Sequence, residues 1–159
     1  MIAWLTESTV GRLLQTFLIS MVPVLELRAG IPYGVSLGLD FHAAALAAIL
    51  GNLLPVPIII LFVRQVFAWL RKRSKGLDIW ISGMETKAEL KGEKVRRYGS
   101  LGLILLVAIP LPGTGAWTGA LVAAVLGLRM RDALPAIVLG VVIAAAIVLG
   151  VTYGVSTIF

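Results

Sequence analysis

Charged positions divide the chain into four apolar blocks. These blocks cover residues 13–39, 43–63, 98–128 and 133–159. The first is interrupted by Glu26 and Arg28, whereas the other three carry no charge. A helix needs about 20 apolar residues to cross a bilayer, so the second and fourth blocks each predict one spanning helix. We therefore expect an all-α integral membrane protein.

The third block has an unusual length for a membrane segment. Its 31 residues would extend about 46 Å as a helix, too long for one span of about 30 Å and too short for two spans with a turn. Its centre, "PLPGTGAWTG" at 110–119, contains two prolines and three glycines. The arm before it, 98–108, reaches about 16 Å, half of a bilayer. We therefore predict a re-entrant hairpin, and a second one around Pro23 in the first block.

The chain resembles itself at an offset of 89 residues. Pro23 aligns with Pro112 and Gly30 with Gly119, and 11 of the 50 positions from 14 to 63 are identical. This predicts two inverted repeats, each a re-entrant helical hairpin followed by one transmembrane helix. We expect a single membrane domain with repeat 1 at about 10–63, a linker at about 64–97 and repeat 2 at about 98–159. Four ordinary spanning helices are the alternative.

Composition and charge place this domain in a membrane and orient it. The chain is 59% hydrophobic and only 14% charged, with a mean hydropathy of +1.00. Ten of its 14 Lys and Arg residues lie in 64–97, and cytoplasmic loops carry such an excess. We expect a multi-pass protein of a prokaryotic-type inner membrane, with a cytoplasmic linker and both termini outside. Apolar residues at helical spacing predict an amphipathic linker helix on the inner leaflet; they are Leu77, Trp80, Ile81, Met84 and Ala88.

Several function classes find no support in the sequence. There is no cysteine, one histidine and no metal-spaced cluster, so we expect no metal site and no cofactor. No nucleophile–base pair or phosphate-binding loop appears, so we do not expect an enzyme. The basic charge follows topology, and we expect no nucleic-acid partner.

Glu26 and Arg28 are the leading candidates for a site, because ionisable groups at membrane depth are commonly functional. They follow Pro23 at the predicted tip of the first hairpin. Glu26 could carry a proton, and the planar guanidinium of Arg28 could hold a phosphate or carboxylate. The alternative is that the two residues neutralise one another or cap opened backbone.

The second predicted tip has no charge and offers backbone groups and hydroxyls. Glycines let backbone approach a ligand, and helix N-termini present free N–H groups to an anion. Its candidate site residues are Pro110, Pro112, Gly113, Thr114, Gly115, Trp117 and Thr118. The alternative is that these glycines serve only hairpin packing. Asn52, near Pro55 and Pro57, could line the cavity or bond freed carbonyls.

Two motifs carry a family resemblance. "PVLELRAGIPYGVSLG" and "IPLPGTGAWTGAL" together resemble the family of small multidrug export proteins, over nearly the whole chain. That family is similar to the DedA (VTT-domain) superfamily, which implies two re-entrant hairpins, movement of lipids or lipid carriers, and proton coupling. By the same resemblance, Glu26 matches the acidic position of the first hairpin.

These observations together predict a transporter. We expect it to move a small molecule or a lipid-linked anion, with proton coupling through Glu26 and a site between the two tips at the bilayer midplane. The alternative is a lipid scramblase or a membrane-assembly factor without coupled transport. The expected partners are the lipid bilayer, the small-molecule or lipid-phosphate substrate, protons and a second copy of the chain in a dimer.

Overall fold

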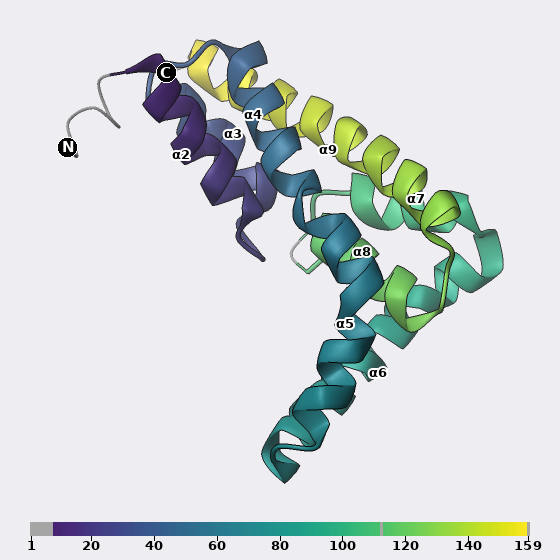
Figure 1. Cartoon of the computed structure of the whole chain (residues 1–159). Helices are drawn as coiled ribbons and strands as arrows, with labels where there is room; N and C mark the ends of the chain where they lie inside the picture. The colour runs from purple at the N-terminus through teal and green to yellow at the C-terminus, as the bar shows by residue number, and fades with distance from the viewer. Residues whose placement is uncertain (1–7, 112, 159) are drawn as a thin grey trace.

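The structure is entirely helical where it is described. This computed structural model describes residues 8–111 and 113–158, and every regular element within these ranges is an α-helix. The helices, labelled as in Figure 1, are α2 Thr9–Met21, α3 Glu26–Ser36, α4 Phe41–Leu53, α5 Pro55–Arg71, α6 Lys75–Tyr98, α7 Ser100–Ala108, α8 Ala116–Val125 and α9 Met130–Ile158. The all-α class predicted from the sequence is therefore confirmed.

Two long apolar helices form the frame of the molecule. α4 and α5 continue into one another as a helix of 31 residues, Phe41–Arg71, because Leu54 between them keeps helical dihedrals. α9 supplies the second, Met130–Val155, with 26 residues. Both exceed the length needed to cross a bilayer. The two spans predicted at 43–63 and 133–159 thus coincide with helices that are long and apolar enough to cross a membrane.

The first long helix extends further than the sequence suggested. α5 continues eight residues beyond Val63, to Arg71, so the segment predicted as a linker from residue 64 begins inside a helix. Arg64 is exposed on this extension, while Phe67 is buried. Arg64, the first charged residue after the apolar block, is therefore an exposed position within the helix and does not mark its end.

Four short helices form two pairs separated by breaks. α2 and α3 have 13 and 11 residues, and α7 and α8 have 9 and 10. At 1.5 Å per residue each is about 14–20 Å long, too short to cross about 30 Å of hydrocarbon alone. We call residues 22–25 the first break and residues 109–115 the second break. Both breaks fall at the positions predicted from Pro23 and Pro110.

Each short pair packs on a long helix in the same way. α2 packs on α4, and α7 packs on α9. Gly51 allows the first approach, since a Cβ there would overlap the backbone carbonyl of Phe17. Gly140, its partner at the 89-residue offset, allows the second, because a Cβ there would meet Val107 at 2.7 Å. For these glycines the sequence match reflects a shared helix–helix contact.

The second helix of each pair ends in the same motif. Gly38 after α3 and Gly127 after α8 lie 89 residues apart, and both have left-handed backbone, with φ +84° and +68°. Glycine adopts this conformation without steric cost, and the motif satisfies the last carbonyls of a helix. The closing bonds run from Leu39 N to Gly34 O at 3.1 Å and from Leu128 N to Ala123 O at 2.9 Å.

The long helices run in opposite directions through the molecule. The Phe41 ring at the start of α4 contacts the Tyr153 ring near the end of α9, with centroids 5.3 Å apart. The far end of the α4–α5 helix projects away from the C-terminal end of α9 (Figure 1). α3 packs against α9, and α8 packs against α5. The second helix of each pair therefore contacts the long helix of the other half.

α6 packs on protein along its apolar face. We predicted that this face lies on the inner leaflet, but Ile81 and Ala88 are buried against the rest of the molecule, and Gly92 and Val95 continue the buried stripe. α6 contacts α7 and α8 along this stripe. Trp80, assigned to the same face from its spacing, is exposed. The helix predicted from the spacing is present, but its apolar face packs mainly on protein.

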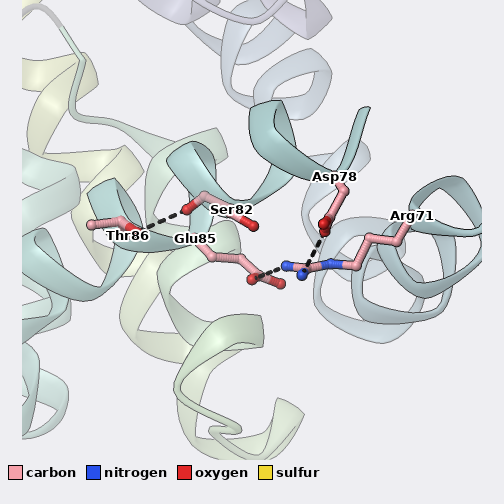
Figure 2. Close-up of polar contacts among 5 residues, drawn as sticks. All are labelled: Arg71, Asp78, Ser82, Glu85 and Thr86. Carbon is pink, nitrogen blue, oxygen red and sulfur yellow. Dashed lines mark hydrogen bonds and ion pairs between the residues drawn. The ribbon is translucent and has the colours of Figure 1, made fainter. Parts of the chain in front are cut away.

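Arg71 at the end of α5 joins two acidic residues of α6 (Figure 2). Its guanidinium donates to Asp78 Oδ1 at 3.0 Å and also to Glu85 Oε2. Within α6 the Thr86 hydroxyl donates to the Ser82 carbonyl at 2.8 Å. Exposed ion pairs contribute only about 0.2–1 kcal/mol each. These bonds therefore orient α6 beside α5 more than they stabilise the fold.

Candidate functional site

Two residues that are not glycine have strained backbone, one in the first break and one at the start of α3. Val24 has φ +77° and Glu26 has φ +49°. The left-handed region is costly for such residues, and most of all for a β-branched valine. Val24 is 89% exposed, whereas Glu26 is 3% exposed. The strain turns the chain sharply and directs the Glu26 side chain into the protein.

The Glu26 carboxylate lies at the N-terminal end of α8. It accepts a hydrogen bond from the backbone N–H of Trp117 at 3.2 Å. Gly115 precedes α8 with φ +114°, and no side chain of α8 caps this end. A Cβ on Gly115 would overlap the Glu26 carboxylate. Because a helix N-terminus attracts negative charge, Glu26 acts as a cap supplied by the other hairpin.

Arg28, two residues after Glu26 in α3, reaches the second break. Its guanidinium donates to the carbonyl of Leu111 and to Thr114 Oγ1, the latter at 2.9 Å. Thr114 Oγ1 also accepts from the Leu111 N–H at 3.2 Å. The Leu111 carbonyl also accepts from the Thr114 N–H within the break, so Arg28 joins α3 to a turn that already has internal hydrogen bonds.

Side chains of α8 and α6 also donate hydrogen bonds to backbone carbonyls near the two breaks. The indole Nε1 of Trp117 donates to the Met21 carbonyl, at the end of α2, at 3.0 Å. Lys91 of α6 donates from Nζ to the Gly113 carbonyl, and Thr118 donates to that carbonyl at 3.1 Å. Side chains of the helix after each break thus bond backbone carbonyls at or beside the other break.

A cavity of about 320 Å³ lies between the two breaks. The breaks and the helices that follow them contribute Pro23, Val24, Glu26, Arg28, Gly113, Thr114, Trp117, Thr118 and Leu121. The opposite wall is formed by Ile59, Val63 and Phe67 of α5 and Met84 of α6. The volume falls within the range of small-molecule sites, which combine apolar walls with a few polar groups. The arrangement can bind an amphiphilic solute.

The structure brings together most of the site residues predicted from the sequence. Seven line this cavity: Pro23, Glu26, Arg28, Gly113, Thr114, Trp117 and Thr118. Gly115 touches Glu26, and Pro110 lies on the far side of Arg28. Pro112 lies outside the described residues. Within the described chain no ion pair joins Glu26 to Arg28, so of the structural alternatives it is backbone capping that is observed.

Asn52 does not join the site. It is 1% exposed in α4, and neither its Nδ2 nor its Oδ1 has a hydrogen-bond partner among the described residues. It is absent from the residues that line the cavity. Neither of the two roles considered for it, lining the cavity or bonding freed carbonyls, is observed.

The glycines fall into two groups. Gly30, Gly34 and Gly119 face neighbouring helices so closely that a Cβ would overlap side chains there. For these three, packing is the role. Gly113 and Gly115 have φ +78° and +114° and shape the second break. These two glycines therefore serve the backbone conformation of the break and not packing alone.

Sequence reasoning missed the contribution of α6. Lys91 and Met84 both reach the second break or the cavity, although the segment was assigned only a surface role. One signal was present, because apolar and small residues continue at helical spacing through Gly92 and Val95. This extended stripe indicates a helix packed along most of its length, although it does not reveal the neighbour.

A comparison with protein families identifies a related group. The model of the family described as "Putative small multi-drug export protein" matches residues 26–147. The match begins at Glu26 and includes the second break and most of α9. No curated protein and no solved structure matches the chain.

Proposed function

The chain belongs to this small multi-drug export family, and from that premise we propose that it is a membrane transporter whose substrate binds between the two breaks. The proposed substrate is a small molecule or a lipid-linked anion. One observation carries the proposal: the cavity of about 320 Å³ combines a buried carboxylate, a guanidinium and apolar walls. Apolar walls bind hydrocarbon, and a guanidinium recognises phosphate or carboxylate.

Glu26 is the proposed proton carrier. As a carboxylate it accepts from the Trp117 N–H at the start of α8. A carboxylic acid is a weaker acceptor than a carboxylate, so a proton on Glu26 would weaken the contact between the first break and α8. Protonation would thereby loosen one hairpin from the other. This links proton movement to the shape of the cavity.

We propose that one half moves against the other during transport. α3 contacts α9, and α8 contacts α5, so each hairpin bridges to the opposite half. Transporters built from inverted repeats with broken helices place the substrate at such a repeat interface. We propose that the two hairpins are re-entrant and that the halves are inverted repeats. The relationship to the DedA superfamily and the dimer stay predictions.

The proposed orientation follows from charge. Residues 64–97, the end of α5 and α6, carry ten of the 14 Lys and Arg residues. This excess favours the cytoplasmic side of an inner membrane. With two spans and two re-entrant hairpins, both termini would lie on the outer side.

A second candidate function rests on a different observation. Glu26 bonds backbone at the start of α8, and Arg28 bonds backbone of the second break. That is also the expected role of two residues that only hold an architecture together. A lipid scramblase or a membrane-assembly factor would need no more than this.

Reconstituted protein distinguishes the two candidates. We would measure uptake of two probes into proteoliposomes, ethidium as a lipophilic cation and a fluorescent alkyl phosphate as a lipophilic anion, with and without a pH gradient. We expect uptake of the alkyl phosphate that requires the gradient and falls at least about tenfold in Glu26→Gln. Glu89→Gln, on the exposed face of α6, is the matched control.

One result would argue against the role of Glu26, and two others would argue against the transporter itself. Unchanged uptake in Glu26→Gln would remove this residue from the mechanism. Lipid movement without a gradient would indicate a scramblase. A protein that folds but moves neither probe nor lipid would indicate an assembly role.

A further inference from the structure

Arg28 lies between two hollows. Besides the cavity at the breaks, it lines a second hollow of about 310 Å³. The other residues around this second hollow are Pro32 of α3, Pro110 of the second break, and Ile147, Val148, Val151 and Thr152 of α9. Among the described residues, Arg28 is the one that lines both hollows.

The second break forms the wall between the hollows. Pro110 faces the second hollow, whereas Gly113 and Thr114 face the first cavity. Arg28 fastens this wall by donating to the Leu111 carbonyl and to Thr114 Oγ1. A ligand that takes the place of these two acceptors on the Arg28 guanidinium would therefore loosen the second break.

The two hollows lie toward different ends of the long helices. The first cavity is bounded by Phe67, near the far end of α5. The second is bounded by Thr152, next to the contact of Tyr153 with Phe41 at the start of α4. Phe41 and Phe67 are 26 residues apart along one helix, or about 39 Å. A solute that passes Arg28 would therefore advance along the axis of the molecule.

The lining of the second hollow selects a chemical class. Within the described part of the chain, its one charged residue is Arg28. The Thr152 hydroxyl already donates to the Val148 carbonyl at 2.8 Å, so it offers an acceptor only. A guanidinium has five N–H donors, and two bonds to the second break leave others free. The remaining walls are aliphatic, which suits a hydrocarbon tail.

We infer that this second hollow is a binding subsite for an amphiphilic anion, a phosphate or carboxylate on an apolar chain, with Arg28 as its anchor. It differs from the first cavity, which Glu26 lines, because no acidic residue of the described ranges 8–111 and 113–158 lines it. The inference rests on the proposed function, since it adds a second position for the same substrate on the other side of Arg28. Arg28 would hold the anion in both positions.

Cysteine protection tests the subsite without any transport measurement. The chain has no cysteine, so Thr152→Cys places one reporter thiol in the second hollow. We would follow maleimide labelling of the purified protein in nanodiscs with dodecyl phosphate, below its micelle concentration, as the probe. We expect labelling to slow about tenfold with dodecyl phosphate, and less than about twofold with dodecanol or inorganic phosphate.

Two further variants assign the effect to the subsite. Ile147→Trp fills the second hollow without changing the bonds of Arg28, and it should abolish protection in a folded protein. Arg28→Ala should abolish it as well, whereas Arg131→Ala, on the exposed start of α9, should not. Ile147→Trp keeps the test decisive if Arg28→Ala fails to fold.

The possible outcomes separate this inference from the transporter proposal. Protection without gradient-driven uptake would support the subsite and contradict the transporter. Uptake without protection would support the transporter and overturn the subsite. Equal protection by dodecanol, or by inorganic phosphate alone, would also overturn it, as would full protection in Ile147→Trp.

Discussion

The first and second breaks lie 89 residues apart and meet in the structure, yet they are built from different residues. The first turns through Val24 and Glu26, two residues for which left-handed backbone is costly. The second turns through Gly113 and Gly115, for which it is not. The first break leads into two charged side chains, and the second offers bare backbone. The charged side chains of the first hairpin bond polar groups of the second, so the two hairpins depend on one another.

Gly115→Ala should have the largest effect, because it removes the space that the second break leaves for the first. The new Cβ would overlap the Glu26 carboxylate, and φ +114° is unfavourable for alanine. We expect a loss of more than about 3 kcal/mol in the free energy of unfolding. Thermal unfolding of the purified protein in detergent would measure it.

The matched control for this change is Gly150→Ala in α9, where a Cβ meets nothing within 4 Å. It should leave the melting temperature unchanged or raise it slightly. If Gly115→Ala melts at the same temperature as Gly150→Ala, the close approach of the two breaks is wrong.

Arg28→Lys tests whether charge alone can hold the second break. Lysine keeps the charge but cannot reproduce the fork that bonds Leu111 O and Thr114 Oγ1 together. We expect a loss of about 2 kcal/mol in stability and about a tenfold fall in alkyl phosphate uptake. Arg131→Lys serves as the control. Full activity and stability in Arg28→Lys would mean that only a positive charge is needed.

Asn52→Leu sharpens the comparison from outside the site. This buried amide has no partner among the described residues, whereas polar groups at the breaks do. Replacing it should raise the free energy of unfolding by about 1–2 kcal/mol. Thr16→Val is the contrasting control, since the buried Thr16 hydroxyl donates to the Arg12 carbonyl at 2.9 Å, and it should be destabilising. Destabilisation by Asn52→Leu would contradict the unpaired amide.

Trp117→Phe should have the smallest effect. It keeps most of the aromatic side chain but removes the hydrogen bond from the Trp117 indole, in α8, to the Met21 carbonyl. A single hydrogen bond of this kind contributes about 1 kcal/mol. Unfolding of Trp117→Phe beside the exposed Trp80→Phe would measure the difference. Equal stabilities would show that the contacts between the breaks run in one direction only.

Much of the architecture was predictable because length and hydropathy constrain it directly. An uncharged block of 31 residues fits neither one span nor two, and proline and glycine at its centre predict where it breaks. The 89-residue offset paired the two breaks before any contact was known. The proximity of Glu26 and Arg28 to the second break follows from that pairing, and the hydrogen bonds are consistent with it.

The remaining features depend on packing that spacing does not encode. Lys91 reaches the second break because α6 packs along α8, and nothing in the charge pattern distinguishes it from the other lysines of the linker. The left-handed backbone of Val24 contradicts its own propensity and is imposed by the surrounding fold. The extension of α5 to Arg71 does not follow from the charge pattern, because the helix continues past Arg64.

We propose that the cavity between the two breaks lies within the membrane, is accessible to water and, in the absence of substrate, opens to one side. Labelling of Thr118→Cys in oriented proteoliposomes with a membrane-impermeant maleimide tests it most directly, since Thr118 lines the cavity. The account predicts labelling from one face of the membrane only, and slower labelling when alkyl phosphate is present. Labelling from neither face, or equal labelling from both, would contradict it.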